Sequence, residues 1–370
     1  MGADQGRIDT HLPEHRRVPK AAEQPTARPR LAGRRYGGAA VLLAVTALFG
    51  TWLGWHIGGT TSVRDFDDTV TALAALAATL ACLQAGLAQR GRLRRFWLLF
   101  SAALAAWTLA EVIWAIYDVV LRTPVPVPSW ADLGYLGAIP LAVCAVLSHP
   151  AARQGGQRQA RAAVDGVVLA TALLFLSWSF VLGPLWRHTD LSSLGGVVAI
   201  AYPFGDVVML FLVVIVIRCM ERGERFELWC VLGGLVAMAA ADSTYTYLVE
   251  NGTYSTGNLV DIGWVVAYLG IALGAFGSNR EEVVEEAYAP AHARGAPLSS
   301  LVLPFLLVLV ALVALALKVE LGRKLLLSDW VMALALTVSV LARQALALFE
   351  GTVPPPAQPV PQVRQGLTGP

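Results

Sequence analysis

The feature that most constrains this chain is a succession of apolar stretches, each long enough to cross a lipid bilayer. A bilayer core about 30 Å thick is crossed by roughly 20 helical residues, and a helix satisfies its own backbone amides within one segment. The stretches run over about ten windows: 37–58, 67–89, 96–119, 130–149, 163–185, 197–218, 226–248, 258–277, 299–318 and 327–349. We therefore expect an all-α, polytopic integral membrane helix bundle of about ten transmembrane helices.

The composition agrees with a membrane protein, because 56% of the residues are hydrophobic and only 15% are charged. Soluble domains carry about 25% charged residues. The net charge of +2 does not indicate a nucleic-acid partner, since the basic residues lie at the ends of the apolar stretches. The partner that the sequence indicates most directly is the lipid bilayer.

The distribution of basic residues predicts the orientation of the helices. Of the 28 Lys and Arg residues, 22 lie in the two tails and in every second connection, and 6 lie in the connections between them. By the positive-inside rule, both termini are cytoplasmic in a multi-pass protein of the cell membrane. The connection that begins near Lys318 runs against this pattern, because it holds three basic residues.

Three regions follow from this reading. Residues 1–36 form a basic, proline-containing segment that we expect to be a disordered cytoplasmic tail, too long and polar for the start of a cleaved signal peptide. Residues 37–350 form the transmembrane helical domain. Residues 351–370 are rich in proline and are expected to be a disordered cytoplasmic tail.

An internal repeat relates the third and fourth predicted helices to the seventh and eighth. An acid late in the ascending helix is followed three residues later by an aromatic residue, as in Glu111 with Trp114 and Asp242 with Tyr245. Each descending helix then opens with Asp, an aliphatic residue, Gly and an aromatic residue, at 132–135 and 261–264. Equivalent helices point the same way, so we predict a parallel duplication rather than an inverted one.

Acidic and aromatic residues of these helices indicate a candidate site. Trp107, Glu111, Trp114 and Asp118 are spaced so that they form one stripe on the third helix, near its outer end. Ionisable groups at membrane depth are costly and usually functional. We predict an outward-facing acidic and aromatic vestibule that binds a small ligand or cation, formed by Glu111, Trp114, Asp132, Tyr135, Tyr202, Asp206, Asp242, Tyr245, Asp261 and Trp264.

Structural roles compete with this interpretation. Asp132 and Asp261 each stand where a helix N-terminus favours an acid, so capping alone would explain them. Glu111 and Asp242 lie late in their helices, where negative charge is unfavourable. For those two, a functional role competes with a buried hydrogen bond. We also expect Glu111 to approach Asp132, and Asp242 to approach Asp261.

The sequence offers no conventional catalytic motif. It contains no glycine-rich phosphate loop, no nucleophile elbow, and no His beside a Ser or Cys at triad spacing. Its four cysteines and six histidines are scattered, without the spacing of metal ligands. We therefore expect a protein that is not an enzyme and that has no cofactor and no metal site.

The segments PSWADLGYL, AYPFGD and LARQALALFEG resemble the multi-helix N-terminal membrane region of actinobacterial signalling proteins that carry GGDEF and EAL domains. The resemblance spans residues 38–351 and rests on Pro128, Asp132, Tyr202, Pro203, Asp206, Asp242 and Asp261. In that family the membrane region precedes cytoplasmic domains that make and break cyclic di-GMP. No GGDEF or EAL sequence occurs in this chain.

The resemblance implies a stand-alone membrane sensor or regulatory subunit that signals through a separate cytoplasmic protein. A transporter or proton-coupled permease that uses the buried Glu and Asp residues is the alternative. Pro140, Pro184 and Pro203 are isolated, whereas broken transporter helices carry paired Gly and Pro interruptions. The absence of such paired interruptions from the sequence favours the sensor over the transporter.

Overall fold

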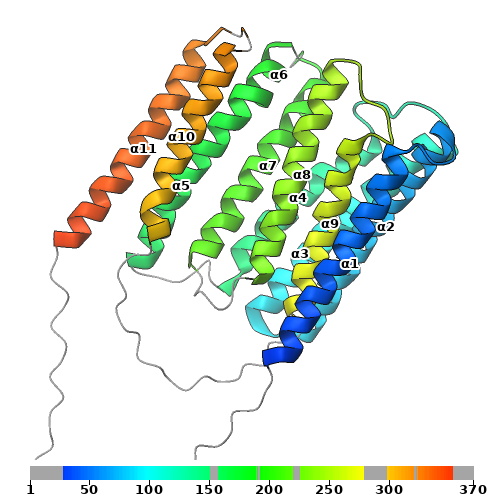
Figure 1. Ribbon diagram of the computed structural model, residues 1–370, viewed down its shortest axis with the longest axis horizontal. Coiled ribbons are helices and arrows are strands. Elements are labelled where there is room, and N and C mark those ends of the chain that lie inside the picture. The colour runs from blue at the N-terminus through cyan, green and yellow to red at the C-terminus, as the bar shows by residue number, and fades with distance from the viewer. Residues whose placement is uncertain are drawn as a thin grey trace, which may run out of the picture.

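The computed structural model describes residues 28–150, 157–188, 190, 192–219, 226–278, 298–320, 322 and 324–352. Long helices run side by side through this part of the chain, and it contains no β-strand (Figure 1). The elements are α1 (Arg28–Gly54), α2 (Gly59–Ala88), α3 (Gly91–Ala115), η1 (Ile116–Val120), α4 (Trp130–Ser148), α5 (Gln157–Ser177), η3 (Trp178–Leu182), α6 (Gly183–His188), α7 (Leu194–Cys219), α8 (Phe226–Glu250), η4 (Leu259–Asp261), α9 (Ile262–Ser278), α10 (Leu298–Glu320) and α11 (Leu327–Thr352).

Eight helices in the described residues are long and apolar enough to cross a membrane. The segments that meet this condition are Gly37–Gly54, Gly59–Ala88, Gly91–Val120, Trp130–Ser148, Leu194–Val214, Phe226–Val249, Leu259–Ser278 and Leu327–Leu346. The predicted windows 163–185 and 299–318 also fall on helices, α5 with η3 and α10. The expectation of an all-α membrane helix bundle is therefore confirmed.

Six of the helices close into a ring. In cyclic order, α2, α3, α4, α7, α8 and α9 each pack against the next, and α9 packs against α2. We call this arrangement the six-helix ring. Helix α1 lies outside it, against α9 and α2. The ring brings together two segments that are distant in sequence, α2 to α4 and α7 to α9.

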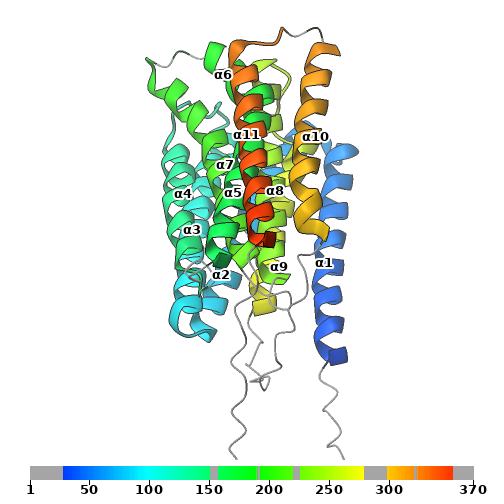
Figure 2. The same ribbon diagram turned by 90° about the vertical axis from the view of Figure 1, so that its left-hand side faces the viewer.

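A second group, α5, α10 and α11, lies to one side of the ring, and Figure 2 views the bundle from that side. Helix α5 joins this group to the ring, because it packs against α7 as well as against α10 and α11. The group has a small hydrophobic core of its own that includes Phe175 and Leu336. Lys318 of α10 donates a 2.6 Å hydrogen bond to Asp329 of α11, and both side chains are buried. This pairing accounts for a lysine at the connection that runs against the charge pattern.

Glycines allow the closest helix contacts in the ring. A Cβ at Gly134 of α4 would lie 2.7 Å from the Ala106 carbonyl oxygen of α3. A Cβ at Gly263 of α9 would lie 2.7 Å from the Cβ of Ala241 on α8. Since real Cβ atoms do not approach other atoms so closely, both positions need glycine.

The two described ends of the chain, at the start of α1 and the end of α11, lie at the same end of the bundle (Figure 1). Helix α1 already begins at Arg28, within the segment predicted to be a tail, and α11 continues to Thr352. The rest of the predicted tails, 1–36 and 351–370, lies outside the described residues.

Candidate functional site

The six-helix ring encloses a cavity of about 270 Å³. It lies in the half of the ring away from the described chain ends, where α3 and α8 end and where α2, α4, α7 and α9 begin. Nine of the ten predicted site residues line it: Glu111, Trp114, Asp132, Tyr135, Tyr202, Asp206, Asp242, Tyr245 and Trp264. The tenth, Asp261, is buried at the start of α9 and is not part of the lining.

Glu111 links three helices at the cavity wall. The Tyr268 hydroxyl of α9 donates a 2.8 Å hydrogen bond to Glu111 Oε1, and Tyr135 of α4 is a second hydrogen-bond partner. On α4 the hydrogen-bond partner of Glu111 is Tyr135, which lies about one helical turn beyond Asp132. The Glu111 carboxyl faces neighbouring helices, so the cost of placing an acid in the membrane is reduced by hydrogen bonds.

Asp132 both caps α4 and lines the cavity. Its Oδ2 accepts a 2.6 Å hydrogen bond from the Ser129 backbone N–H, which completes a capping box. Its Oδ1 accepts a 2.5 Å hydrogen bond from the Tyr202 hydroxyl of α7. Capping therefore accounts for one oxygen of Asp132, while the other joins α4 to its neighbour α7 in the ring.

Asp242 and the aromatic side chains around it form another part of the cavity wall. The Trp264 indole N–H donates a 2.7 Å hydrogen bond to Asp242 Oδ1. Tyr245 packs edge-on against Tyr254, Trp264 and Trp114, at ring-centroid distances of 4.6, 5.7 and 6.5 Å. Trp114 of α3 and Tyr245 of α8 are equivalent in the predicted repeat, and here they contact each other.

Asp206 differs from the other predicted acids. Asp206 lines the cavity, and its Oδ2 is buried and accepts no hydrogen bond from any described residue. Asp242 of α8 acts on it electrostatically. A buried carboxyl oxygen without a donor is costly, which makes it a candidate for contact with a ligand.

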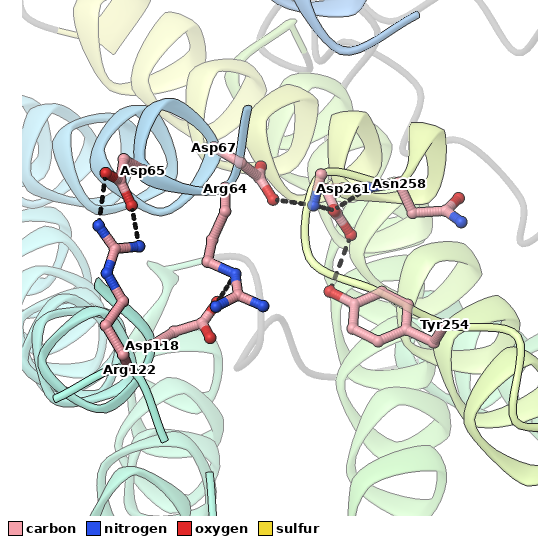
Figure 3. Close-up of polar contacts among 9 residues, drawn as sticks. Arg64, Asp65, Asp67, Asp118, Arg122, Tyr254, Asn258 and Asp261 are labelled. Carbon is pink, nitrogen blue, oxygen red and sulfur yellow. Dashed lines mark hydrogen bonds and ion pairs between the residues drawn. The ribbon is translucent and has the colours of Figure 1, made fainter. Parts of the chain in front are cut away.

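Asp261 is the centre of a second network, beside the cavity (Figure 3). Its Oδ2 accepts hydrogen bonds from the backbone N–H groups of Gly257, at 2.9 Å, and Asn258, at 2.8 Å. The Tyr254 hydroxyl donates to Oδ1 at 3.2 Å. Burial and the nearby Asp261 raise the pKa of Tyr254, so this hydroxyl keeps its proton and remains a donor.

The sequence interpretation missed the acids of α2. Asp67 of α2 lies within hydrogen-bond reach of the Asp261 carboxyl, and it also accepts a 2.9 Å hydrogen bond from the Gly257 N–H. Asp68, the next residue, lies within hydrogen-bond reach of Asp118. Both α2 acids line the cavity and are almost fully buried. Both stand at the start of the predicted window 67–89, and their partners come from other helices, so the sequence pattern alone does not report them.

Two arginines near the start of α2 and the end of η1 pair with acids beside the cavity, and we call this edge the rim (Figure 3). Arg64 lies 3.5 Å from Asp118 Oδ2, and Arg122 donates two hydrogen bonds to Asp65, at 2.5 and 2.8 Å. Asp118 is not part of the cavity lining, unlike the rest of its predicted stripe. It lies in the π-helical turn η1, where the helical register differs from that of α3.

Comparison with family models, curated proteins and solved structures found no match for this chain.

Proposed function

We propose that this protein is a non-enzymatic membrane sensor or regulatory subunit that binds a small ligand in the cavity and signals through a separate cytoplasmic partner. The observation that carries the proposal is a cavity that occupies one half of a ring whose other half is filled. In that other half, Phe96, Trp97 and Phe100 are fully buried. Trp97 donates a 2.8 Å hydrogen bond to Ser278 Oγ, which joins the start of α3 to the end of α9.

Orientation is part of the proposal. If the described chain ends are cytoplasmic, as the basic residues indicate, the cavity lies toward the outside of the cell and its closed floor toward the cytoplasm. A cavity confined to the outer half, above a layer of buried aromatic side chains, suits detection of an external ligand. A transport pathway would instead have to pass through the half of the ring that contains Phe96, Trp97 and Phe100.

A route for the signal is available through packed helices. Tyr202 and Asp206 line the cavity from α7, which packs against α5, which in turn packs against α11. Arg343 of α11 donates a 2.9 Å hydrogen bond to Asp165 of α5 near the chain-end side of the bundle. We propose residues 343–350 as the contact with the cytoplasmic partner, in keeping with the resemblance to membrane regions of cyclic di-GMP signalling proteins.

We also propose that the ring arose by parallel duplication of a three-helix unit, α2 to α4 and α7 to α9. Both units contain a capping box with Asp at its third position, at Asp132 and Asp261. Both place a glycine two residues later against small residues of the preceding helix, at Gly134 and Gly263. These matching contacts support the predicted two-helix repeat, and the ring order places α2 and α7 at equivalent positions before it.

A transporter or proton-coupled permease is the second candidate, and one observation favours it. Two carboxyl pairs, Asp67 with Asp261 and Asp68 with Asp118, each lie within hydrogen-bond reach. A hydrogen bond between two carboxyls requires a shared proton, and such pairs are typical of proton relays in membranes.

The first test is accessibility. In a variant without native cysteines, Thr246→Cys places a thiol at the cavity. We expect a membrane-impermeant methanethiosulfonate to modify it in intact cells, together with Thr123→Cys and Thr253→Cys in the connections at that end. Arg90→Cys, in the connection between α2 and α3, should react only after permeabilisation. Modification of Arg90→Cys in intact cells would contradict the orientation.

The second test separates the sensor from the transporter. Purified protein in proteoliposomes should neither move solutes nor make or hydrolyse cyclic di-GMP, and its cellular effect should require a co-purifying cytoplasmic protein. Glu111→Gln keeps the shape of the side chain, so it should change the response without unfolding the protein. Solute flux that Glu111→Gln abolishes would decide for the transporter.

A further inference from the structure

We propose that the ligand of the cavity is a small organic cation, held between aromatic side chains and the carboxyl group of Asp206. This inference rests on the proposed function, since it takes the cavity to be a ligand site. It goes further by assigning the chemical class of the ligand.

The charge of the lining is the first argument. Six acids line the cavity, and no Lys, Arg or His does so among the described residues: Asp67, Asp68, Glu111, Asp132, Asp206 and Asp242. The nearby rim arginines, Arg64 and Arg122, are already paired with Asp118 and Asp65. Asp67 and Asp68 each lie within hydrogen-bond reach of another carboxyl, and a shared proton lowers the charge of those pairs. The other four acids have no basic residue beside them in the lining, so the cavity is complementary to a cation and unfavourable to an anion.

Asp206 is the second argument, and it is independent of the first. Tyr and Trp side chains donate hydrogen bonds to Glu111, Asp132 and Asp242. Asp206 Oδ2 is buried and has no donor in the described part of the chain. A positive charge in the cavity would offset the burial of the Asp206 carboxyl electrostatically, without the need for a hydrogen-bond donor.

The aromatic lining separates an organic cation from a metal ion. Eight aromatic side chains border the cavity: Trp107, Trp114, Tyr135, Tyr202, Tyr245, Tyr254, Trp264 and Tyr268. Aromatic faces attract quaternary ammonium groups, whereas metal ions such as Ca²⁺ require several converging oxygen ligands. No group of three His, Cys, Asp or Glu side chains suited to a metal occurs in the described residues. The volume of about 270 Å³ also suits a small molecule rather than a bare ion.

The test uses the full-length protein in lipid nanodiscs and pairs of probes that differ in charge alone. Choline and benzyltrimethylammonium are compared with 3,3-dimethylbutan-1-ol and neopentylbenzene, their uncharged carbon analogues. Binding is followed by tryptophan fluorescence, because Trp107, Trp114 and Trp264 border the cavity, and by calorimetry. We expect at least one ammonium probe to bind about tenfold or more tightly than its analogue.

Matched variants identify the site. Asp206→Asn should weaken ammonium binding by about tenfold or more, since it removes the charge but keeps the shape. Asp190→Asn is the control, because Asp190 is exposed in the connection before α7 and does not line the cavity. Trp114→Leu should weaken binding by about tenfold, whereas Trp330→Leu, on an exposed face of α11, should not. Thermal melting checks that each variant is folded.

The outcomes distinguish this inference from the proposed function. Equal binding of an ammonium probe and its carbon analogue would overturn the cation inference and leave the cavity as a ligand site. Failure of every ammonium probe to bind, in a protein whose Thr246→Cys variant is modified from outside, would overturn the cation inference alone. Failure of binding together with an unreactive Thr246→Cys would count against the proposed function as well.

Discussion

The two halves of the six-helix ring, α2 to α4 and α7 to α9, share the contacts within each hairpin but differ in the contacts between the halves. Within each hairpin, the acid of the ascending helix meets the aromatic residue of the descending helix, as Glu111 with Tyr135 and Asp242 with Trp264. Between the halves, Asp132 accepts from Tyr202 of α7, whereas Asp261 faces the acid Asp67 of α2.

The difference comes from the first helix of each half. Helix α2 brings two buried acids to the ring, Asp67 and Asp68, and α7 brings Tyr202 and Asp206. Of the acids that line the cavity, Asp206 alone has neither a hydrogen-bond donor nor a carboxyl within hydrogen-bond reach among the described residues. The two hairpins, α3 with α4 and α8 with α9, therefore form similar walls of the cavity. The cavity is asymmetric because α2 and α7 contribute different side chains to it. This favours a single ligand position rather than two equal ones.

The largest effect is expected where the hairpins pack most closely. Gly134→Leu and Gly263→Leu should each prevent folding, because a Cβ there meets the preceding helix at 2.7 Å. Gly137→Leu and Gly233→Leu are the matched controls, since a Cβ at either position meets nothing within 4 Å. Size-exclusion profiles of the purified variants measure the outcome. Sensitivity in only one hairpin would contradict the shared plan.

A smaller, unequal effect is expected at the two caps. Asp132→Ala removes a helix cap and the acceptor of the Tyr202 hydroxyl, and should cost about 1–2 kcal/mol of stability. Asp261→Ala should cost more, about 2–3 kcal/mol, because it is almost fully buried and two backbone N–H groups and the Tyr254 hydroxyl lose their acceptor. Thermal denaturation in detergent compares the two. Equal losses would show that the Asp261 network adds nothing beyond capping.

Loss of the acid–aromatic hydrogen bond in each hairpin should lower stability by smaller amounts, which differ less between the two halves. Tyr135→Phe should cost about 0.5 kcal/mol, because Glu111 keeps the hydrogen bond from Tyr268. Trp264→Phe should cost about 1.5 kcal/mol, since it removes the indole that donates to Asp242. The same denaturation assay ranks them. A greater loss of stability in Tyr135→Phe than in Trp264→Phe would mean that the two contacts are not equivalent.

The smallest effect is expected at the rim of the first half. Arg122 and Asp65 form an exposed ion pair, and water screens such pairs strongly. Arg122→Gln should leave the melting temperature unchanged, and Arg122→Lys serves as the charge-conserving control. A clear loss of stability in Arg122→Gln alone would show that the rim pair holds α2 to the end of α3.

The sequence by itself determined the fold class, most helix positions and much of the candidate site. Every predicted window falls on a helix, because a segment in a bilayer must satisfy its own backbone hydrogen bonds, and this requirement is local. Capping at Asp132 and Asp261 was readable for the same reason, since a cap involves residues within three positions of each other.

Only the tertiary structure decided which helices are neighbours and what their polar groups face. The contacts of Asp67 with Asp261 and of Tyr202 with Asp132 join residues that are far apart in the chain, so no local pattern reports them. The unpaired oxygen of Asp206 is likewise visible only once six helices have closed around it. Helix formation depends on neighbouring residues, whereas helix association depends on how glycines and hydrogen-bonding side chains of distant segments fit together.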